Sequence, residues 1–89
     1  MGADAREQIE IAFRNVKAAL DSVGASFSDI VKLNTYIVDI GTNLAHYREV
    51  RDKFVNMSAP PASTAIGVPQ LARPGALFEI EAIVALPPK

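Results

Sequence analysis

The sequence predicts an α+β fold in which two helices pack on one face of a mixed β-sheet. Two segments carry apolar residues at helical spacing, and three others have the alternation or the β-branched content of strands. They follow one another as helix, strand, helix, strand, strand within 89 residues, a length that suits one small domain. Two helices cover only one face of a three-stranded sheet, so the other face must meet solvent or another subunit. Aliphatic residues interleaved on that face favour another subunit.

The first helix is expected over residues 5–23. Asp4 and Glu7 have the spacing of a capping box, in which Asp4 accepts a hydrogen bond from a backbone N–H of the first turn. Glu10 and Arg14 are spaced to form an i,i+4 ion pair, and Gly24 fits the position that ends a helix. The predicted buried stripe consists of Ile9, Ala12, Phe13, Val16, Ala19, Leu20 and Val23.

A strand is predicted over residues 29–39, because this segment is rich in β-branched and aromatic residues. One predicted face consists of Val31, Leu33, Thr35 and Ile37. The other face combines polar and apolar side chains, namely Ile30, Lys32, Asn34, Tyr36 and Val38. A mixed face of this kind is expected where a sheet meets a partner or a pocket.

The second helix is expected over residues 44–55, with Gly41-Thr42-Asn43 breaking the preceding strand and supplying the N-cap. Its apolar stripe is formed by Leu44, Tyr47, Val50 and Phe54. Glu49 and Lys53 have the spacing of an i,i+4 ion pair on the surface of this helix.

Two further strands are predicted over residues 62–68 and 76–85, separated by a turn at Arg73-Pro74-Gly75. The last strand has the clearest alternation in the chain. One face is formed by Phe78, Ile80, Ala82 and Val84. The other face is formed by Leu77, Glu79, Glu81 and Ile83, so two carboxylates share it.

Composition excludes several classes of function. The chain has no cysteine and a single histidine, which excludes disulfides, cysteine–zinc sites and histidine-rich metal sites. The net charge is −1 and the basic residues are dispersed, so neither a nucleic-acid partner nor an anionic membrane is expected. No apolar run is long enough to span a bilayer and no signal peptide is recognisable, so we expect a cytoplasmic protein. Self-association is the remaining way to stabilise so short a chain.

Glu79 and Glu81 are the first candidates for chemistry. Two residues apart on a strand, their side chains lie on one face, roughly 6.5–7 Å apart. Such a pair divides acid and base roles when the two environments differ, and the alternative is two solvated carboxylates. Arg48 and Arg51 flank the stripe of the second helix, where each could bind a substrate carboxylate or simply face solvent.

The remaining polar candidates carry weaker signals. His46 lies near the start of the second helix and has no serine or aspartate partner at motif spacing, which favours an exposed helix histidine. Ser63 and Thr64 lack the glycine-flanked elbow of a hydrolase nucleophile, and the isolated glycines form no phosphate-binding loop.

The carboxy-terminal third resembles the signature of the RidA (YjgF) family, whose members are also labelled endoribonuclease L-PSP. The segments that carry the resemblance are Pro61-Ala62-Ser63-Thr64-Ala65-Ile66-Gly67-Val68, Leu71-Ala72-Arg73-Pro74 and Leu77-Phe78-Glu79-Ile80-Glu81-Ala82-Ile83. Asn15-Val16-Lys17-Ala18-Ala19-Leu20 and Ile30-Val31-Lys32-Leu33-Asn34-Thr35-Tyr36-Ile37-Val38-Asp39 are similar to the family's first helix and the strand after it. The resemblance therefore covers nearly the whole chain.

This resemblance implies a chorismate-mutase-like α+β fold that assembles as a homotrimer, with pockets at the subunit interfaces. It also implies hydrolysis of imines or enamines, without a cofactor, to 2-keto acids and ammonia. Glu79 matches the family glutamate that orients the attacking water, whereas Ser63 stands where family enzymes carry the arginine that binds the substrate carboxylate. Ser63 and Thr64 are then expected in the substrate-binding region. Arg48 stands roughly at the position of a pocket asparagine that family enzymes carry on the second helix, and we expect Arg48 to restore a positive charge to the pocket.

Three functions remain open at this stage. The first is binding of a small keto acid-like or imine-like metabolite, with deaminase activity based on Glu79. The second is a non-catalytic oligomeric binding module, which Ser63 and the missing family strands before the first helix favour. Those missing strands are expected to reflect either a truncated product or a reduced variant of the fold. The third, an endoribonuclease, fits poorly with a net charge of −1.

Overall fold

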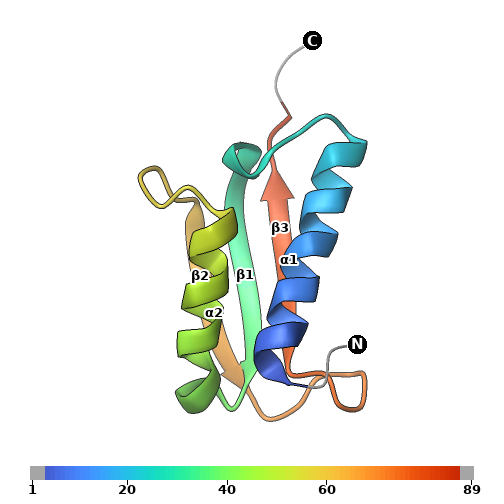
Figure 1. Cartoon of the computed structure of the whole chain (residues 1–89), viewed down its shortest axis with the longest axis vertical. Coiled ribbons are helices and arrows are strands. Elements are labelled where there is room, and N and C mark those ends of the chain that lie inside the picture. Colours follow the sequence, from blue (N-terminus) through green and yellow to red (C-terminus); the bar gives the residue numbers. More distant parts are fainter. Residues whose placement is uncertain (1–3, 87–89) are drawn as a thin grey trace.

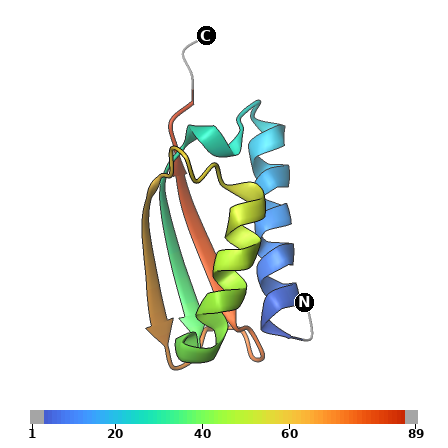
Figure 2. The ribbon, with the colours of Figure 1, turned by 60° about the vertical axis from the view of Figure 1, so that its left-hand side comes forward.

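Strand β1 lies at the centre of a three-stranded sheet, and two helices cover one of its faces (Figures 1 and 2). The computed structural model describes residues 4–86. The elements in chain order are α1 (Ala5–Ser22), the 3₁₀ turn η1 (Phe27–Asp29), β1 (Ile30–Val38), α2 (Ile40–Phe54), β2 (Ala62–Val68) and β3 (Phe78–Val84). β2 pairs with β1 in parallel, and β3 pairs with β1 antiparallel on its other side, which confirms the predicted mixed sheet.

Both ends of α1 are formed by the residues that the sequence indicates. The side chain of Asp4 accepts a hydrogen bond of 2.8 Å from the backbone N–H of Glu7. At the other end Gly24 adopts a positive φ of 71°, and the N–H of Ala25 donates to the carbonyl of Leu20 at 2.9 Å. This arrangement satisfies carbonyls of the last turn and ends the helix at Ser22, just before the predicted limit.

The core lies between the helices and the sheet, and the Phe13 ring is at its centre. This ring stacks against the rings of Phe27, Tyr47, Phe54 and Phe78, with centroids 5.4–6.3 Å away. Five aromatic rings from both helices, η1 and β3 thus form one cluster. Burial of so much apolar surface supplies most of the driving force that fixes the helices on the sheet.

The two faces of β1 are as predicted except at its first two residues. Leu33, Thr35 and Ile37 are buried beneath the helices, as predicted. Val31 is half exposed and Ile30 is buried, so the assignment of these two residues to the opposite faces was wrong. The pairing with β3 shifts between Ile30 and Lys32, and this β-bulge inserts one extra residue that reverses the alternation.

The second helix begins at Ile40, four residues before the predicted start. Asp39 turns the chain directly from β1 into the helix by adopting a left-handed conformation, with φ 52° and ψ 57°. Aspartate tolerates this conformation better than most residues, so no glycine is needed for the turn. Asn43 is therefore not the N-cap but a buried residue within α2, whose amide donates to the carbonyl of Val38 at 2.8 Å.

The faces of β3 are as predicted, and the extents of the two edge strands differ little from the prediction. β2 spans the predicted residues, whereas β3 begins at Phe78 and not at residue 76 because Ala76 still belongs to the preceding turn, its N–H bound to the Arg73 carbonyl at 3.1 Å. Gly67 in β2 lies against the start of α2. A Cβ added there would be only 2.6 Å from Cγ2 of Ile40, so only glycine fits without a shift of α2.

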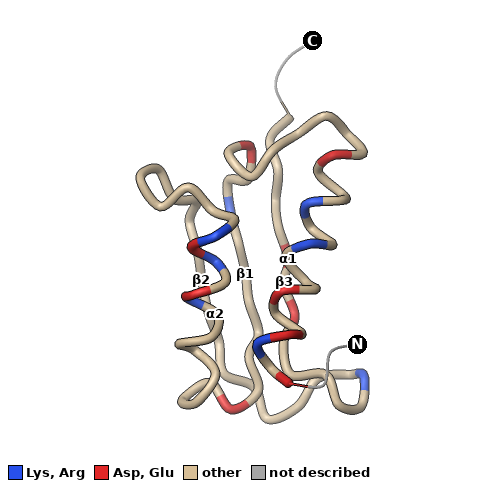
Figure 3. Tube along the Cα trace, in the orientation of Figure 1, with Lys and Arg blue, Asp and Glu red and all other residues tan. Residues whose placement is uncertain are grey.

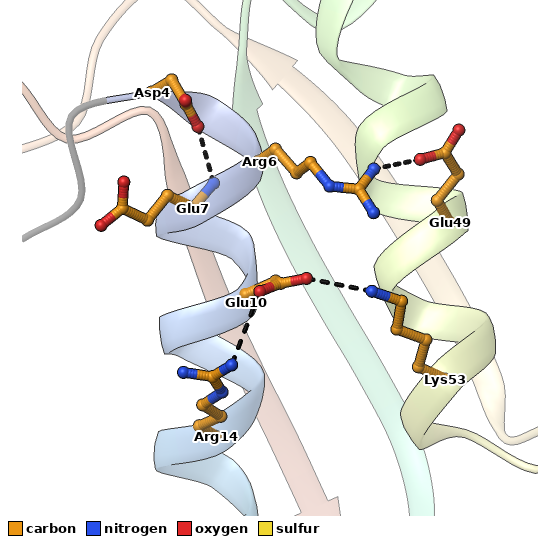
Figure 4. Close-up of polar contacts among 7 residues, drawn as sticks. All are labelled: Asp4, Arg6, Glu7, Glu10, Arg14, Glu49 and Lys53. Atoms are coloured by element: carbon orange, nitrogen blue, oxygen red, sulfur yellow. Dashed lines mark hydrogen bonds and ion pairs between the residues drawn. The ribbon is translucent and has the colours of Figure 1, made fainter.

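Charged residues of both signs are interspersed along the two helices (Figure 3). Arg6 of α1 pairs with Glu49 of α2, and Nζ of Lys53 lies 3.1 Å from Oε1 of Glu10 (Figure 4). The predicted Glu10–Arg14 pair is present, with 3.6 Å between its atoms. The predicted Glu49–Lys53 pair is absent, because Glu49 pairs with Arg6 and Lys53 pairs with Glu10 on the neighbouring helix.

Candidate functional site

The face of the sheet opposite the helices carries most of the polar residues of the three strands, including all of their charged ones. We call it the open face; it consists of Lys32, Asn34 and Tyr36 on β1, Ala62, Thr64 and Ile66 on β2, and Glu79, Glu81 and Ile83 on β3. No helix of the described residues lies over it (Figure 2). Ile66 and Ile83 remain 45% and 56% exposed, so the open face presents apolar side chains among its charged ones.

Strand pairing arranges the open face in rows across the sheet. Tyr36 lies between Ile66 and Glu79, and Asn34 lies between Thr64 and Glu81. The hydroxyl of Tyr36 does not bind Glu79, its direct neighbour, but donates to Oε1 of Glu81 at 2.7 Å. Both carboxylates of the predicted acid–base pair therefore lie beside one phenol, and only one of them accepts its hydrogen bond.

The pKa of the Tyr36 hydroxyl is raised above its ordinary value, chiefly by the hydrogen bond that it donates to Glu81. Partial burial and the negative charges of Glu81 and Glu79 act in the same direction. Tyr36 is therefore a neutral donor throughout the neutral pH range, and its proton is directed to one defined oxygen.

The predicted site residues do not meet within one chain. Glu79 and Thr64 both belong to the open face, on opposite edge strands. Ser63 pairs with Leu33 and so belongs to the face that the helices cover, although its position on an edge strand leaves it exposed. Arg48 is an exposed residue of α2, on that same side of the sheet. The expected contribution of Arg48 to a pocket around Glu79 therefore requires a second copy of the chain.

Arg51 and His46 have structural surroundings that explain them without a ligand. The guanidinium of Arg51 lies over the Tyr47 ring, 5.6 Å from its centroid, and also pairs with Asp52 at 3.0 Å. His46 is half-buried on α2 and forms no ion pair or hydrogen bond among the described residues. These observations favour the structural interpretation of both residues.

A hollow of about 370 Å³ lies at the end of β1 where β2 passes into β3, lined by Val38 and residues 69–77. Gln8 of α1 holds this loop through both ends of its amide, since Nε2 donates to the Gly75 carbonyl at 3.0 Å and Oε1 accepts from the Leu77 N–H at 2.7 Å. This contact was not predicted from the sequence. The sequence holds one indication of it: Gln8 is a polar residue at helical spacing from apolar ones, three residues after Ala5 and four before Ala12.

Among residues 4–86 no three histidine, aspartate or glutamate side chains gather as a possible metal site. No helix of these residues combines the length and the apolar character needed to cross a membrane.

Comparison with known proteins identifies the family. The family model described as endoribonuclease L-PSP matches residues 1–86, almost the full length. The chain belongs to the RidA/YjgF family. A solved structure from Yersinia pestis, a protein of unknown function of the conserved Rid family, is 37% identical and superposes with a TM-score of 0.87 over 97% of this chain and 65% of that one. The α+β fold and the predicted family resemblance are thus confirmed.

Two curated relatives show how similar this Rid-family chain is to other proteins in sequence. A RutC family protein of Pyrococcus abyssi is 36% identical over 80 residues, which are 90% of this chain and 61% of the relative. A 2-iminobutanoate/2-iminopropanoate deaminase of Dermatophagoides farinae is 35% identical over 81 residues, covering 91% of this chain and 61% of that protein. The chain therefore spans about three fifths of the length of these relatives.

Proposed function

We propose that this Rid-family chain binds a small imine or enamine between copies of itself and hydrolyses it to a carbonyl compound and ammonia. The observation that carries the proposal is the position of Glu79. Its carboxylate is exposed on the open face and has no hydrogen-bond partner among residues 4–86, so it is available to a water molecule. It also occupies the place of the family glutamate that orients the attacking water, and one relative is named as an imine deaminase.

The chemistry requires only groups that this chain can supply. Water adds to the carbon of a protonated C=N bond while Glu79 accepts one proton from the water, which gives a neutral carbinolamine. Glu79 then returns this proton to the nitrogen. As the C–N bond breaks, the carbinolamine hydroxyl gives its proton back to Glu79, and the products are a carbonyl compound and ammonia. An enamine enters the same route after protonation at carbon. No electrons are gained or lost, so no redox cofactor is needed.

The proposed site is shared between subunits, and a homotrimer is the expected assembly. Glu79 on the open face and Ser63 and Arg48 on the opposite side can approach one another only when two copies combine. The exposed Ile66 and Ile83 give the open face the apolar surface that an interface between copies needs. In this arrangement Arg48 supplies the positive charge for a keto acid-like or imine-like ligand, and Ser63 and Thr64 line the pocket.

One observation favours a non-catalytic binding module as the second candidate. A serine hydroxyl at position 63 cannot form the bidentate, charge-assisted contact that arginine makes with a carboxylate. Loss of such a contact in a sheltered site weakens binding by on the order of several kcal/mol. A chain that keeps the assembly but loses this anchor would hold metabolites or partners without turning them over.

Release of ammonia from a freshly generated imine separates these two candidates. We expect Glu79→Ala to lower the rate by roughly 10²–10⁴-fold, the usual contribution of a positioned base. Glu7→Ala is the matched control, because Glu7 is an exposed glutamate of α1 whose carboxylate forms no contact among residues 4–86. Equal rates in the parent, both variants and buffer would reject the enzyme and leave the binding module.

A further inference from the structure

The two glutamates of β3 face the same side of the sheet but have different surroundings. Glu79 lies directly opposite Tyr36 in the strand register, at the separation where paired side chains touch. Glu81 lies opposite Asn34 and is therefore a diagonal neighbour of Tyr36. The phenol nevertheless leans to the diagonal position and donates its proton to Oε1 of Glu81 at 2.7 Å. One donor thus lies within reach of two carboxylates and is bound by the more distant one.

We propose that Glu81 is a positioning residue, which captures the Tyr36 hydroxyl and thereby keeps this donor away from Glu79. The inference rests on the proposed role of Glu79 as the group that takes a proton from water. A carboxylate that accepts a hydrogen bond from a phenol is a weaker base, because the bond stabilises its charged form. As long as Glu81 holds the phenol, no hydrogen bond from Tyr36 reaches the carboxylate of Glu79.

No other charged group of the open face replaces Glu81 in this role. β2 contributes only the uncharged Ala62, Thr64 and Ile66, and β1 contributes one cation, Lys32. Lys32 lies opposite Ile83, one row beyond Glu81 and two rows from Glu79, and it forms no ion pair among residues 4–86. The raised pKa of Tyr36, to which both glutamates contribute, agrees with a phenol that both carboxylates can approach.

Three variants test this role by the rate of imine hydrolysis. In Glu81→Ala the phenol is released and can donate to Glu79, so we expect the rate at neutral pH to fall about tenfold and the acid limb of the pH–rate profile to move to lower pH. Glu81→Gln keeps an oxygen that accepts the phenol and should retain most of the parent rate. Removal of the phenol as well, in Tyr36→Phe/Glu81→Ala, should restore the rate and the profile.

The double variant excludes a merely structural role, since loss of a second side chain does not repair a damaged fold. The proposal is overturned if Glu81→Ala leaves the rate unchanged, or if the double variant is as slow as Glu81→Ala. Either result would mean that the phenol does not compete for Glu79.

Titration of Tyr36, followed by NMR of labelled tyrosine, tests the same competition between Glu81 and Glu79 for the phenol and needs no activity assay. We expect the pKa of Tyr36 to stay raised in Glu81→Ala, because the phenol now donates to Glu79, and to fall only in Glu79→Ala/Glu81→Ala. A fall already in Glu81→Ala overturns the inference. If the parent releases no ammonia at all, the proposed function fails, and this titration still decides whether Glu81 controls the phenol.

Discussion

The two faces of one sheet differ completely in what they contact. The covered face places Leu33, Thr35 and Ile37 under two helices and an aromatic cluster, and none of these side chains is more than 1% exposed. The open face, built from the alternate residues of the same strands, carries three charged residues and two exposed isoleucines. A single chain therefore completes its hydrophobic core on one side of the sheet and leaves the side chains of the other side exposed.

Two tyrosines show the same difference at the level of single atoms. On the covered side, Tyr47 is 2% exposed and its hydroxyl has no hydrogen-bond partner among residues 4–86. On the open face, the Tyr36 hydroxyl is bound to a carboxylate. Packing alone determines the position of the Tyr47 ring, whereas a polar contact determines that of Tyr36. The comparison teaches that stabilising apolar packing is concentrated on the covered face and separated from the open one.

The largest expected effect comes from truncation of matched isoleucines on the two faces. Ile37→Ala should lower the free energy of unfolding by about 2–5 kcal/mol, because Ile37 is fully buried and its removal leaves a cavity. Ile83→Ala on the open face should cost less than about 1 kcal/mol in dilute protein. Urea unfolding at several protein concentrations measures both. A cost for Ile83→Ala that grows with concentration would identify the open face as an interface, and equal costs in dilute protein would contradict the separation.

A smaller effect is expected at Tyr47. Tyr47→Phe should leave the protein equally stable or stabilise it by up to about 1 kcal/mol, because the change removes a buried hydroxyl without a partner and keeps the ring. Thermal and urea unfolding would show this as an unchanged or higher midpoint. Tyr36→Phe serves as the comparison, since it removes a hydroxyl that does form a hydrogen bond. A clear loss of stability in Tyr47→Phe would show that its hydroxyl is satisfied in solution.

The smallest effect concerns the ion pairs between the helices. The pKa of Glu10 lies below its ordinary value of 4.5, mainly because Lys53 donates a hydrogen bond to it and attracts its negative charge. A carboxyl with a lowered folded pKa contributes stability that is complete above its unfolded pKa and is lost as the pH falls through the folded value. Lys53→Met should therefore flatten the decline in stability below about pH 4.5. An acid unfolding curve unchanged from the parent would assign no role to the pair.

The helices and strands could be predicted well where the signal is local. The ends of α1 at Asp4 and Gly24 follow from residues close together in the chain, and these assignments are confirmed. The predicted buried stripe holds at Ile9, Phe13 and Leu20, but Ala19 and Val23 near the end of the helix are exposed, so their assignment to it was wrong. The start of α2 could not be predicted, because a left-handed Asp39 has no distinctive sequence pattern and Gly41 has the stronger signal of a break. The β-bulge that reverses the face of Val31 depends on the pairing with β3. The sequence around Val31 carries no information about that pairing.

The candidate site was predictable in composition but not in arrangement. Alternation placed Tyr36, Glu79 and Glu81 on one face, as the structure has them. The hydrogen bond between Tyr36 and Glu81 depends on the antiparallel register, and the assignment of Ser63 to the covered face and of Thr64 to the open face depends on the parallel one. Neither register can be deduced from one sequence, so the partners of these side chains became visible only in three dimensions.

The hydrogen bonds of the Gln8 amide have a consequence for folding during synthesis on the ribosome. The amide joins the first turn of α1 to Leu77, which follows 69 residues later. At a synthesis rate of about 5–20 residues per second, α1 waits roughly 3–14 s for this contact. During that interval β1, α2 and β2 are made, but β3 is missing. Until β3 is added, Phe13 of α1 lacks the Phe78 ring that stacks against it in the folded core.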